Sequence, residues 1–158
     1  MPDSYVYTHI VTLSDTNVTG NVYFAEYVRW QGIAREMFLL DEVPTALPTD
    51  KDQAVVTTFV ECQFLAECEA FDRIDIHVTA DRVTSTSLEL RFDYRRCTDD
   101  SEVTIARGRQ GLAWLLWDKT GWQTGEVPPE LPRAIETFLA RPADARSGLT
   151  KSQPKPLR

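Results

Sequence analysis

The residues best suited to chemistry stand in a polar turn that runs directly into a long helical segment. Asp15 and Asn17 are the acidic and amide side chains of this turn, Gly20 follows them, and Asn21 and Val22 lead into the helix. The first N–H groups of a helix have no acceptor within it, and such donors stabilise a carbonyl oxygen that becomes an oxyanion. The turn therefore predicts acyl chemistry, with backbone N–H groups contributed by Gly20, Asn21 and Val22.

Asn17 occupies the position in this turn where a carboxylate would act as base or nucleophile. Its neutral amide cannot be a general base near neutral pH, but it can donate a hydrogen bond to a carbonyl oxygen or hold a water molecule. The alternative is that Asn17 only shapes the turn, because asparagine tolerates left-handed geometry and bonds its own backbone. The nearby carboxylates offer no clear substitute: Asp15 is expected to support the turn, and Glu26 and Glu36 fall off the apolar face of the helix.

Residues 23–40 form the main predicted helix, because apolar side chains recur at the spacing of one helix face. Tyr27 lies at the centre of this face, as a core aromatic or as a residue whose hydroxyl reaches the wall of a site. Arg35 lies about 80° around the helix from Tyr27. Its stem either covers apolar surface or carries a guanidinium into a groove. The predicted apolar face consists of Tyr23, Phe24, Tyr27, Trp30, Ala34, Met37 and Phe38.

The rest of the chain predicts strands and one further helix. Alternating or β-branched runs predict strands at residues 5–13, 54–65, 71–82, 86–96 and 103–117, and a second helix is expected at 129–140. The links at 66–70, 83–85 and 98–102 have hairpin length, which predicts that the strands they join are antiparallel neighbours. One long helix against such a sheet is an α+β arrangement. We expect a single domain over residues 1–140 and a disordered tail over 141–158.

Composition limits the possible partners and cofactors. The net charge of −7 argues against nucleic acid or an anionic membrane as partner, and no run of residues is long and apolar enough to span a bilayer. The N-terminus lacks the features of a secretory signal, so a cytoplasmic protein with reduced thiols at Cys62, Cys68 and Cys97 is expected. Neither metal-ligand spacing nor a phosphate or dinucleotide motif is present, so no metal and no cofactor are predicted. His9 and His77 give no sign of a catalytic triad.

The turn and helix carry a resemblance to a known family. Residues 15–27 are similar to the pattern D-x-D-x-x-G-x-V-Y-F-x-x-Y of hotdog-fold thioesterases of the 4-hydroxybenzoyl-CoA thioesterase type. The usual catalytic aspartate of that family is replaced here by Asn17. The helical run R-W-Q-G-I-A-R-E-M-F at residues 29–38 resembles, more specifically, the thioesterases that accompany iterative polyketide synthases of enediyne biosynthesis. The segments 61–64, 92–95 and 106–110 also resemble that subgroup, so the resemblance covers about residues 5 to 140.

The resemblance implies a substrate and an assembly. The substrate would be a long polyene β-ketoacyl chain, held as a thioester on the acyl carrier domain of the synthase. Hydrolysis would give a β-keto acid, which can lose CO₂ to form a methyl ketone or a polyene hydrocarbon. The resemblance further implies a homotetramer built from dimers, with active sites at subunit interfaces. It places Thr57 at the site and lets Arg35 bind the β-keto oxygen or the developing carboxylate, although the adjacent Thr58 would take the place of Thr57 if the alignment shifted by one residue.

The mechanism expected from these residues needs no enzymic carboxylate. Water attacks the thioester carbonyl, the helix start and Asn17 stabilise the oxyanion, Arg35 orients the acyl head, and tyrosine and threonine hydroxyls place the water. Two other functions stay open, namely a general acyl-CoA thioesterase and a non-catalytic module that binds a polyketide. An acidic carrier domain would need a basic docking patch, either the C-terminal tail or a strand face that is otherwise only solvated: Arg73, Arg82, Arg95, Arg96, Arg107 and Arg109.

Overall fold

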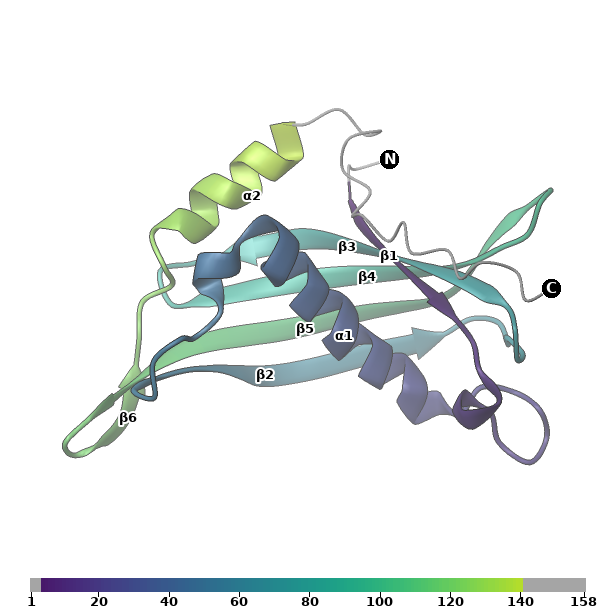
Figure 1. Cartoon of the computed structure of the whole chain (residues 1–158), viewed down its shortest axis with the longest axis horizontal. Coiled ribbons are helices and arrows are strands. Elements are labelled where there is room, and N and C mark those ends of the chain that lie inside the picture. The colour runs from purple at the N-terminus through teal and green to yellow at the C-terminus, as the bar shows by residue number, and fades with distance from the viewer. Residues whose placement is uncertain (1–3, 141–158) are drawn as a thin grey trace, which may run out of the picture.

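The chain folds as a curved antiparallel sheet wrapped around one long helix. The computed structural model describes residues 4–140, so the tail predicted over 141–158 lies outside the described residues. Figure 1 shows α1 lying along one face of the sheet and α2 beside one end of α1. This arrangement confirms the predicted α+β class. The elements are β1 (Tyr5–Ile10), α1 (Phe24–Glu42), β2 (Gln53–Phe64), β3 (Arg73–Val83), β4 (Ser87–Cys97), β5 (Glu102–Asp118), β6 (Gly121–Thr124) and α2 (Glu130–Ala140), with 3-10 turns at Leu13–Asp15 and Pro44–Ala46.

The strand order is β1-β3-β4-β5-β2, and β6 extends the sheet by pairing with the end of β5. The predicted hairpins β3–β4 and β4–β5 are confirmed. The predicted pairing of β2 with β3 is wrong, because β2 pairs with β5 and β3 pairs with β1. The short link after β2 is instead held by the polar turn, through an isolated bridge between Asn21 and Glu69 and a hydrogen bond from Val22 N to Cys68 O (3.1 Å). A short link permits a hairpin, but tertiary contacts decide whether one forms.

Two element boundaries also differ from expectation. β1 ends at Ile10, three residues early, because the chain turns into the 3-10 segment that precedes Asp15. β6 was not predicted from the sequence, since four residues give too short a pattern to separate from a loop. The other predicted helices and strands begin and end within two residues of their observed positions.

The core lies between α1 and the inner face of the sheet. Trp30, Ala34 and Phe38 of α1 are almost fully buried, against inward side chains of the three central strands. Two members of the predicted helix face are exposed instead: Tyr23 at 48% and Phe24 at 58%. The first turn of α1 therefore leaves two large aromatic rings uncovered. The inward side chains of β3 and β4 are Ile74, Ile76, Val78, Leu88, Leu90, Phe92 and Tyr94.

Two close approaches on β5 depend on the absence of a side chain. A Cβ at Gly108 would lie 2.0 Å from Nε2 of Gln31, which is buried and donates to Glu61 O at 3.0 Å. A Cβ at Gly111 would lie 2.4 Å from the ring of Phe59. The register of β2 on β5 shifts between Thr57 and Phe59, so β2 carries a bulge opposite this glycine. Bulges re-aim neighbouring side chains, and this one sets which residues of β2 face α1.

Candidate active site

The polar turn before α1 is built around Asn17. Its N–H donates to Asn21 O (2.8 Å), and its carbonyl accepts the N–H of Gly20 (3.0 Å). Gly20 adopts φ +89°, a left-handed conformation that glycine reaches without the penalty of a Cβ. Oδ1 of Asn17 accepts the N–H of Thr19 (3.0 Å). Asn17 therefore shapes the turn, and its Nδ2 group, for which no partner occurs within residues 4–140, is left as a donor.

Asp15 stabilises this turn through its buried carboxylate. It is 2% exposed, and its Oδ2 accepts hydrogen bonds from Thr12 N (2.8 Å) and His9 Nε2 (3.1 Å), while Arg29 Nη2 lies 3.3 Å from Oδ1. Burial by itself would raise the pKa of Asp15, but the hydrogen bonds from Thr12 and His9 outweigh burial and hold that pKa below its usual value. Asp15 is thus an ionised structural residue, which confirms the expectation that it supports the turn.

Replacing Asp15 with asparagine should lower the free energy of unfolding by about 1–3 kcal/mol at pH 7, since donors that face a carboxylate are left poorly matched. Because the folded pKa is depressed, the carboxylate stabilises the fold above its unfolded pKa, and this contribution is lost as pH falls through the folded value. Urea unfolding at pH 7 and near pH 3 measures both effects, with the exposed Asp100→Asn variant as control. A gap between wild type and Asp15→Asn that does not shrink at the lower pH would contradict the assignment.

A cavity of about 480 Å³ lies between this turn, the first turns of α1 and the end of β2. Four residues predicted for the site line it together: Asn17, Asn21, Val22 and Tyr27. We call it the Asn17 cavity. Its remaining walls are largely apolar, which suits an acyl chain beside a reacting carbonyl. Those walls are formed by Tyr23, Phe24, Phe64, Leu65, Ala66, Glu67 and Cys68.

The backbone donors at this cavity differ in part from those expected. The N–H of Gly20 is engaged by Asn17 O, and the N–H of Val22 by Cys68 O. Both groups are used within the chain because the turn closes on itself and on the link after β2. The start of α1 has no capping side chain at Tyr23, which leaves the N–H groups of Phe24 and Ala25 as the donors of the first helical turn.

Tyr27 contributes a neutral hydroxyl to the cavity wall. Its OH lies 3.2 Å from Cys68 Sγ, and burial, with the Cys68 contact second, raises the pKa of the Tyr27 hydroxyl far above its usual value. The three cysteines are free, and burial raises the pKa of Cys62 and of Cys97 to about 11 each. It also raises the pKa of Cys68. These thiols are protonated at neutral pH, so they are poor nucleophiles.

Arg35 lies elsewhere on α1, where it contacts β2 and β5. Nη1 donates to Thr57 Oγ1 (2.9 Å) and to Gln110 Oε1 (3.4 Å), and Nη2 lies 3.3 Å from Glu36 Oε1. Of the two adjacent threonines, Thr57 contacts Arg35, while Thr58 stands at the bulge. Arg35 also opens onto a second cavity of about 360 Å³, the Arg35 cavity, whose other lining residues are Glu36, Met37, Leu39, Leu40, Leu47, Pro48 and Val55.

Within one chain, Asn17 and Arg35 do not meet. Arg35 lies eleven positions after Phe24, where α1 begins, and this places it about 16 Å along the helix axis from the start of α1. The two cavities share no lining residue. A single chain therefore holds the predicted residues in two separate groups, one at the helix start and one near mid-helix.

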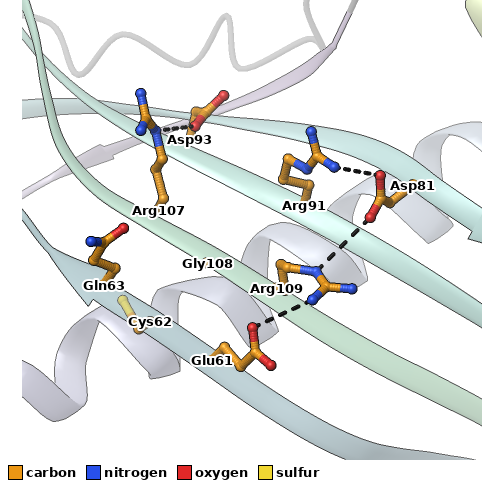
Figure 2. A pocket seen from close by; sticks show the side chains of 9 residues that line it. All are labelled: Glu61, Cys62, Gln63, Asp81, Arg91, Asp93, Arg107, Gly108 and Arg109. Carbon is orange, nitrogen blue, oxygen red and sulfur yellow. Dashed lines mark hydrogen bonds and ion pairs between the residues drawn. The ribbon is translucent and has the colours of Figure 1, made fainter.

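A larger hollow, about 790 Å³, lies on the outer face of the sheet (Figure 2). Figure 2 shows Arg91 and Arg109 both turned toward Asp81, and Arg107 toward Asp93. The nitrogen–oxygen distances of these ion pairs are 2.6 Å for Arg91, 3.9 Å for Arg109 and 3.5 Å for Arg107. The arginines are neutralised by carboxylates of the same face. The side chains around this hollow form a network of exposed ion pairs, each of which contributes little to the stability of the fold. None of the predicted catalytic residues lines the hollow.

The same neutralisation applies to the predicted basic docking patch. Five of its six arginines lie within ion-pair distance of a carboxylate, so the strand face offers an acidic carrier domain no unbalanced positive charge from them. The pairs are Arg73 with Asp75, Arg95 with Glu102, Arg96 with Asp72, Arg107 with Asp93, and Arg109 with Glu61, Asp81 and Glu89.

Across residues 4–140, no group of three or more His, Cys, Asp or Glu side chains is placed to hold a metal ion. In the same range, neither helix combines the length and apolar character needed to cross a membrane.

Comparison with known proteins assigns the family. Residues 11–137 match the model of the thioesterase-like superfamily. The chain belongs to this superfamily. Among solved structures, this thioesterase is similar to the dynemicin thioesterase, whose crystal structures reveal induced-fit and allosteric effects upon polyene binding. The two are 39% identical, the match covers 85% of this chain and 96% of that chain, and the TM-score is 0.81.

More distant structures share the fold of this thioesterase. The 1,4-dihydroxy-2-naphthoyl-CoA thioesterase from Synechocystis is 18% identical, with 84% of this chain and 95% of that chain covered and a TM-score of 0.70. The 4-hydroxybenzoyl-CoA thioesterase from Pseudomonas sp. strain CBS-3 is 16% identical, with coverages of 84% and 99% and a TM-score of 0.71. A search of curated proteins gave no match. The hotdog fold, the thioesterase activity and the resemblance stated from the sequence are confirmed.

Proposed function

We propose that this thioesterase hydrolyses a polyene β-ketoacyl thioester carried by the acyl carrier domain of an iterative enediyne polyketide synthase in the cytoplasm. The product is a β-keto acid, which can lose CO₂ to give a methyl ketone or a polyene. The observation that carries the proposal is the 39% identity with the dynemicin thioesterase over 96% of that chain, because polyene binding is described for that protein. The apolar walls of the Asn17 cavity and of the Arg35 cavity suit the same class of chain.

The catalytic unit in this proposal is a dimer formed along β2. This strand is an edge of the sheet, twelve residues long, with one side unpaired. Two copies paired antiparallel through β2, with the two-fold axis between Val60 and Glu61, would place Thr57 of one strand opposite Phe64 of the other. Thr57 binds Arg35, and Phe64 lines the Asn17 cavity, so this pairing directs Arg35 of one subunit toward the Asn17 cavity of the other. Two such dimers would form the homotetramer.

In the completed site, each group has a separate task. The uncapped N–H groups at the start of α1 and Nδ2 of Asn17 stabilise the oxyanion that forms when water attacks the thioester carbonyl. The guanidinium of Arg35 orients the β-keto oxygen and then binds the carboxylate product. The hydroxyls of Tyr27 and Thr57 are neutral and help to place the attacking water. No ionised side chain acts as base; the C–S bond breaks as the intermediate collapses, and the carrier thiolate leaves with the proton that the water gives up.

The substrate assignment is tested with one acyl chain presented on two carriers. The purified protein is incubated with a polyene 3-oxoacyl chain on the isolated carrier domain, and separately with the same chain on coenzyme A. Product release is followed by chromatography and mass spectrometry. We expect a kcat/KM at least about tenfold higher for the carrier-bound chain, because a protein carrier adds contacts that coenzyme A lacks.

Two outcomes of this comparison would contradict the proposal. Faster hydrolysis of the coenzyme A ester would favour a general acyl-CoA thioesterase. Tight binding of the chain without release from either carrier would favour a binding module. An otherwise identical chain that lacks the 3-oxo group serves as the matched control, and the β-keto role of Arg35 predicts that it reacts more slowly.

A further inference from the structure

Gln110 is a buried amide on a part of the sheet that is otherwise apolar. It is 2% exposed and points inward from β5, where it lies opposite Leu90 of β4 and Val60 of β2. The next inward residues of β5, Leu112 and Trp114, are also apolar. Burying an amide at such a position costs free energy unless its polar atoms form hydrogen bonds.

The buried amide of Gln110 accepts a hydrogen bond from the guanidinium of Arg35. Nη1 carries two hydrogens and has two acceptors, Thr57 Oγ1 at 2.9 Å and Gln110 Oε1 at 3.4 Å. Nη2 reaches Glu36 Oε1 at 3.3 Å. For Nε–H and the second hydrogen of Nη2, no acceptor occurs among residues 4–140. The two acceptors of Nη1 come from different strands, β2 and β5.

We propose that Gln110 is a positioning residue that selects which edge of the Arg35 guanidinium faces the substrate. This inference rests on the function proposed above. With Thr57 alone as acceptor, the planar guanidinium could pivot about that bond, whereas a second acceptor fixes its plane. Holding Nη1 leaves the Nε–Nη2 edge for the ligand, and this edge presents its N–H groups side by side to the β-keto oxygen of the acyl chain.

The consequence is a specific dependence on the 3-oxo group. A chain without that oxygen gains nothing from the orientation of the guanidinium, so loss of Gln110 should scarcely affect it. A 3-oxoacyl chain depends on a correctly aimed donor, and small misplacements of a catalytic group are costly in rate. A merely structural role for Gln110 would slow both substrates alike.

The test uses N-acetylcysteamine thioesters of a 3-oxoacyl chain and of the same chain without the 3-oxo group. Gln110→Leu should lower kcat/KM for the 3-oxo substrate by about tenfold or more, and for the plain substrate by less than about twofold. Gln110→Glu keeps an acceptor oxygen in place and should stay within about threefold of wild type on both. In an Arg35→Ala background, Gln110→Leu should add less than about twofold on either substrate, because the residue acts through Arg35.

The controls separate this inference from the proposed function. Gln123→Leu changes the same residue type at an exposed strand position and should leave both rates unchanged. Gln110→Met replaces the leucine variant if that protein does not fold. Equal losses on both substrates, a Gln110→Glu variant as slow as Gln110→Leu, or an undiminished effect in the Arg35→Ala background would overturn the positioning role. An Arg35→Ala variant as fast as wild type would overturn the proposed function itself.

Discussion

Replacing Asn17 with alanine is expected to lower turnover of a polyene β-ketoacyl thioester by about 10²–10³-fold, the usual effect of losing one preorganised oxyanion donor. Asn17 lines the cavity at the start of α1, next to helix N–H groups that no side chain caps. Steady-state kcat on the carrier-bound chain measures the loss. Val18→Ala, in the same turn but fully exposed, is the matched control and should keep wild-type turnover. An Asn17→Ala variant that folds and retains full turnover would reject the oxyanion role.

Mixing two inactive variants extends this prediction to the dimer. If Asn17 and Arg35 act together across subunits, Asn17→Ala and Arg35→Ala chains form mixed dimers in which one site has both residues intact. Random assortment makes about half of the dimers mixed, so unfolding and refolding an equal mixture should restore about one quarter of wild-type activity. A site contained within one chain would show no recovery, since every site would then carry one substitution. Recovery by mixing is therefore the direct test of the shared site.

Replacing Trp30 with alanine is expected to lower the free energy of unfolding by about 3–5 kcal/mol, the range found for buried tryptophan and phenylalanine. Trp30 is fully buried on α1, and its ring lies 4.5 Å from that of His9 and 5.2 Å from that of Tyr27, centroid to centroid. Its Nε1–H is buried without an acceptor among the described residues, so the contribution of this side chain comes from packing. Urea unfolding followed by circular dichroism measures the change.

Two further variants make the Trp30 prediction specific. Trp30→Phe removes the unpartnered N–H and keeps a ring in place, so we expect a cost below about 2 kcal/mol. Trp122→Ala removes a tryptophan that is 46% exposed and packs edge to face on Trp117, and we expect a loss of about 1 kcal/mol or less. Equal losses for Trp30→Ala and Trp122→Ala would show that α1 does not form the centre of the core.

The absence of a carboxylate at position 17 is the main chemical feature of the candidate site, and among the residues that line the Asn17 cavity only Glu67 carries one. Asp15 is the carboxylate nearest to Asn17 in sequence, and it is occupied by hydrogen bonds from the Thr12 backbone and from His9. Glu36 lies beside Arg35, which offsets its charge. Rate enhancement would then come from donors that are fixed in advance of the reaction and directed at the developing oxyanion, beside the largely apolar walls of the cavity.

Local signals in the sequence determined the turn, the main helix and most strands. Asn17 and Gly20 mark a turn because their backbone preferences are intrinsic to those residue types, and the helix and strands follow from the periodicity of their apolar residues. The exposed rings of Tyr23 and Phe24 escaped that reasoning. Helix periodicity says which residues share a side, but it does not say how far along the helix the sheet extends.

Tertiary structure alone decided the strand order, the bulge in β2 and the grouping of the site residues. The link after β2 has hairpin length, yet contacts of Cys68 and Glu69 with the polar turn carry the chain across to β3 instead. In the sequence, Gln110 looks like an ordinary polar strand residue and Gln31 like an ordinary polar helix residue. Their burial depends on partners that are distant in the chain: Arg35 for Gln110, and Gly108 for Gln31. The separation of Asn17 from Arg35 within one chain also follows from the structure, because Asn17 precedes the start of α1 and Arg35 lies eleven positions into it. The two would meet only in the proposed dimer.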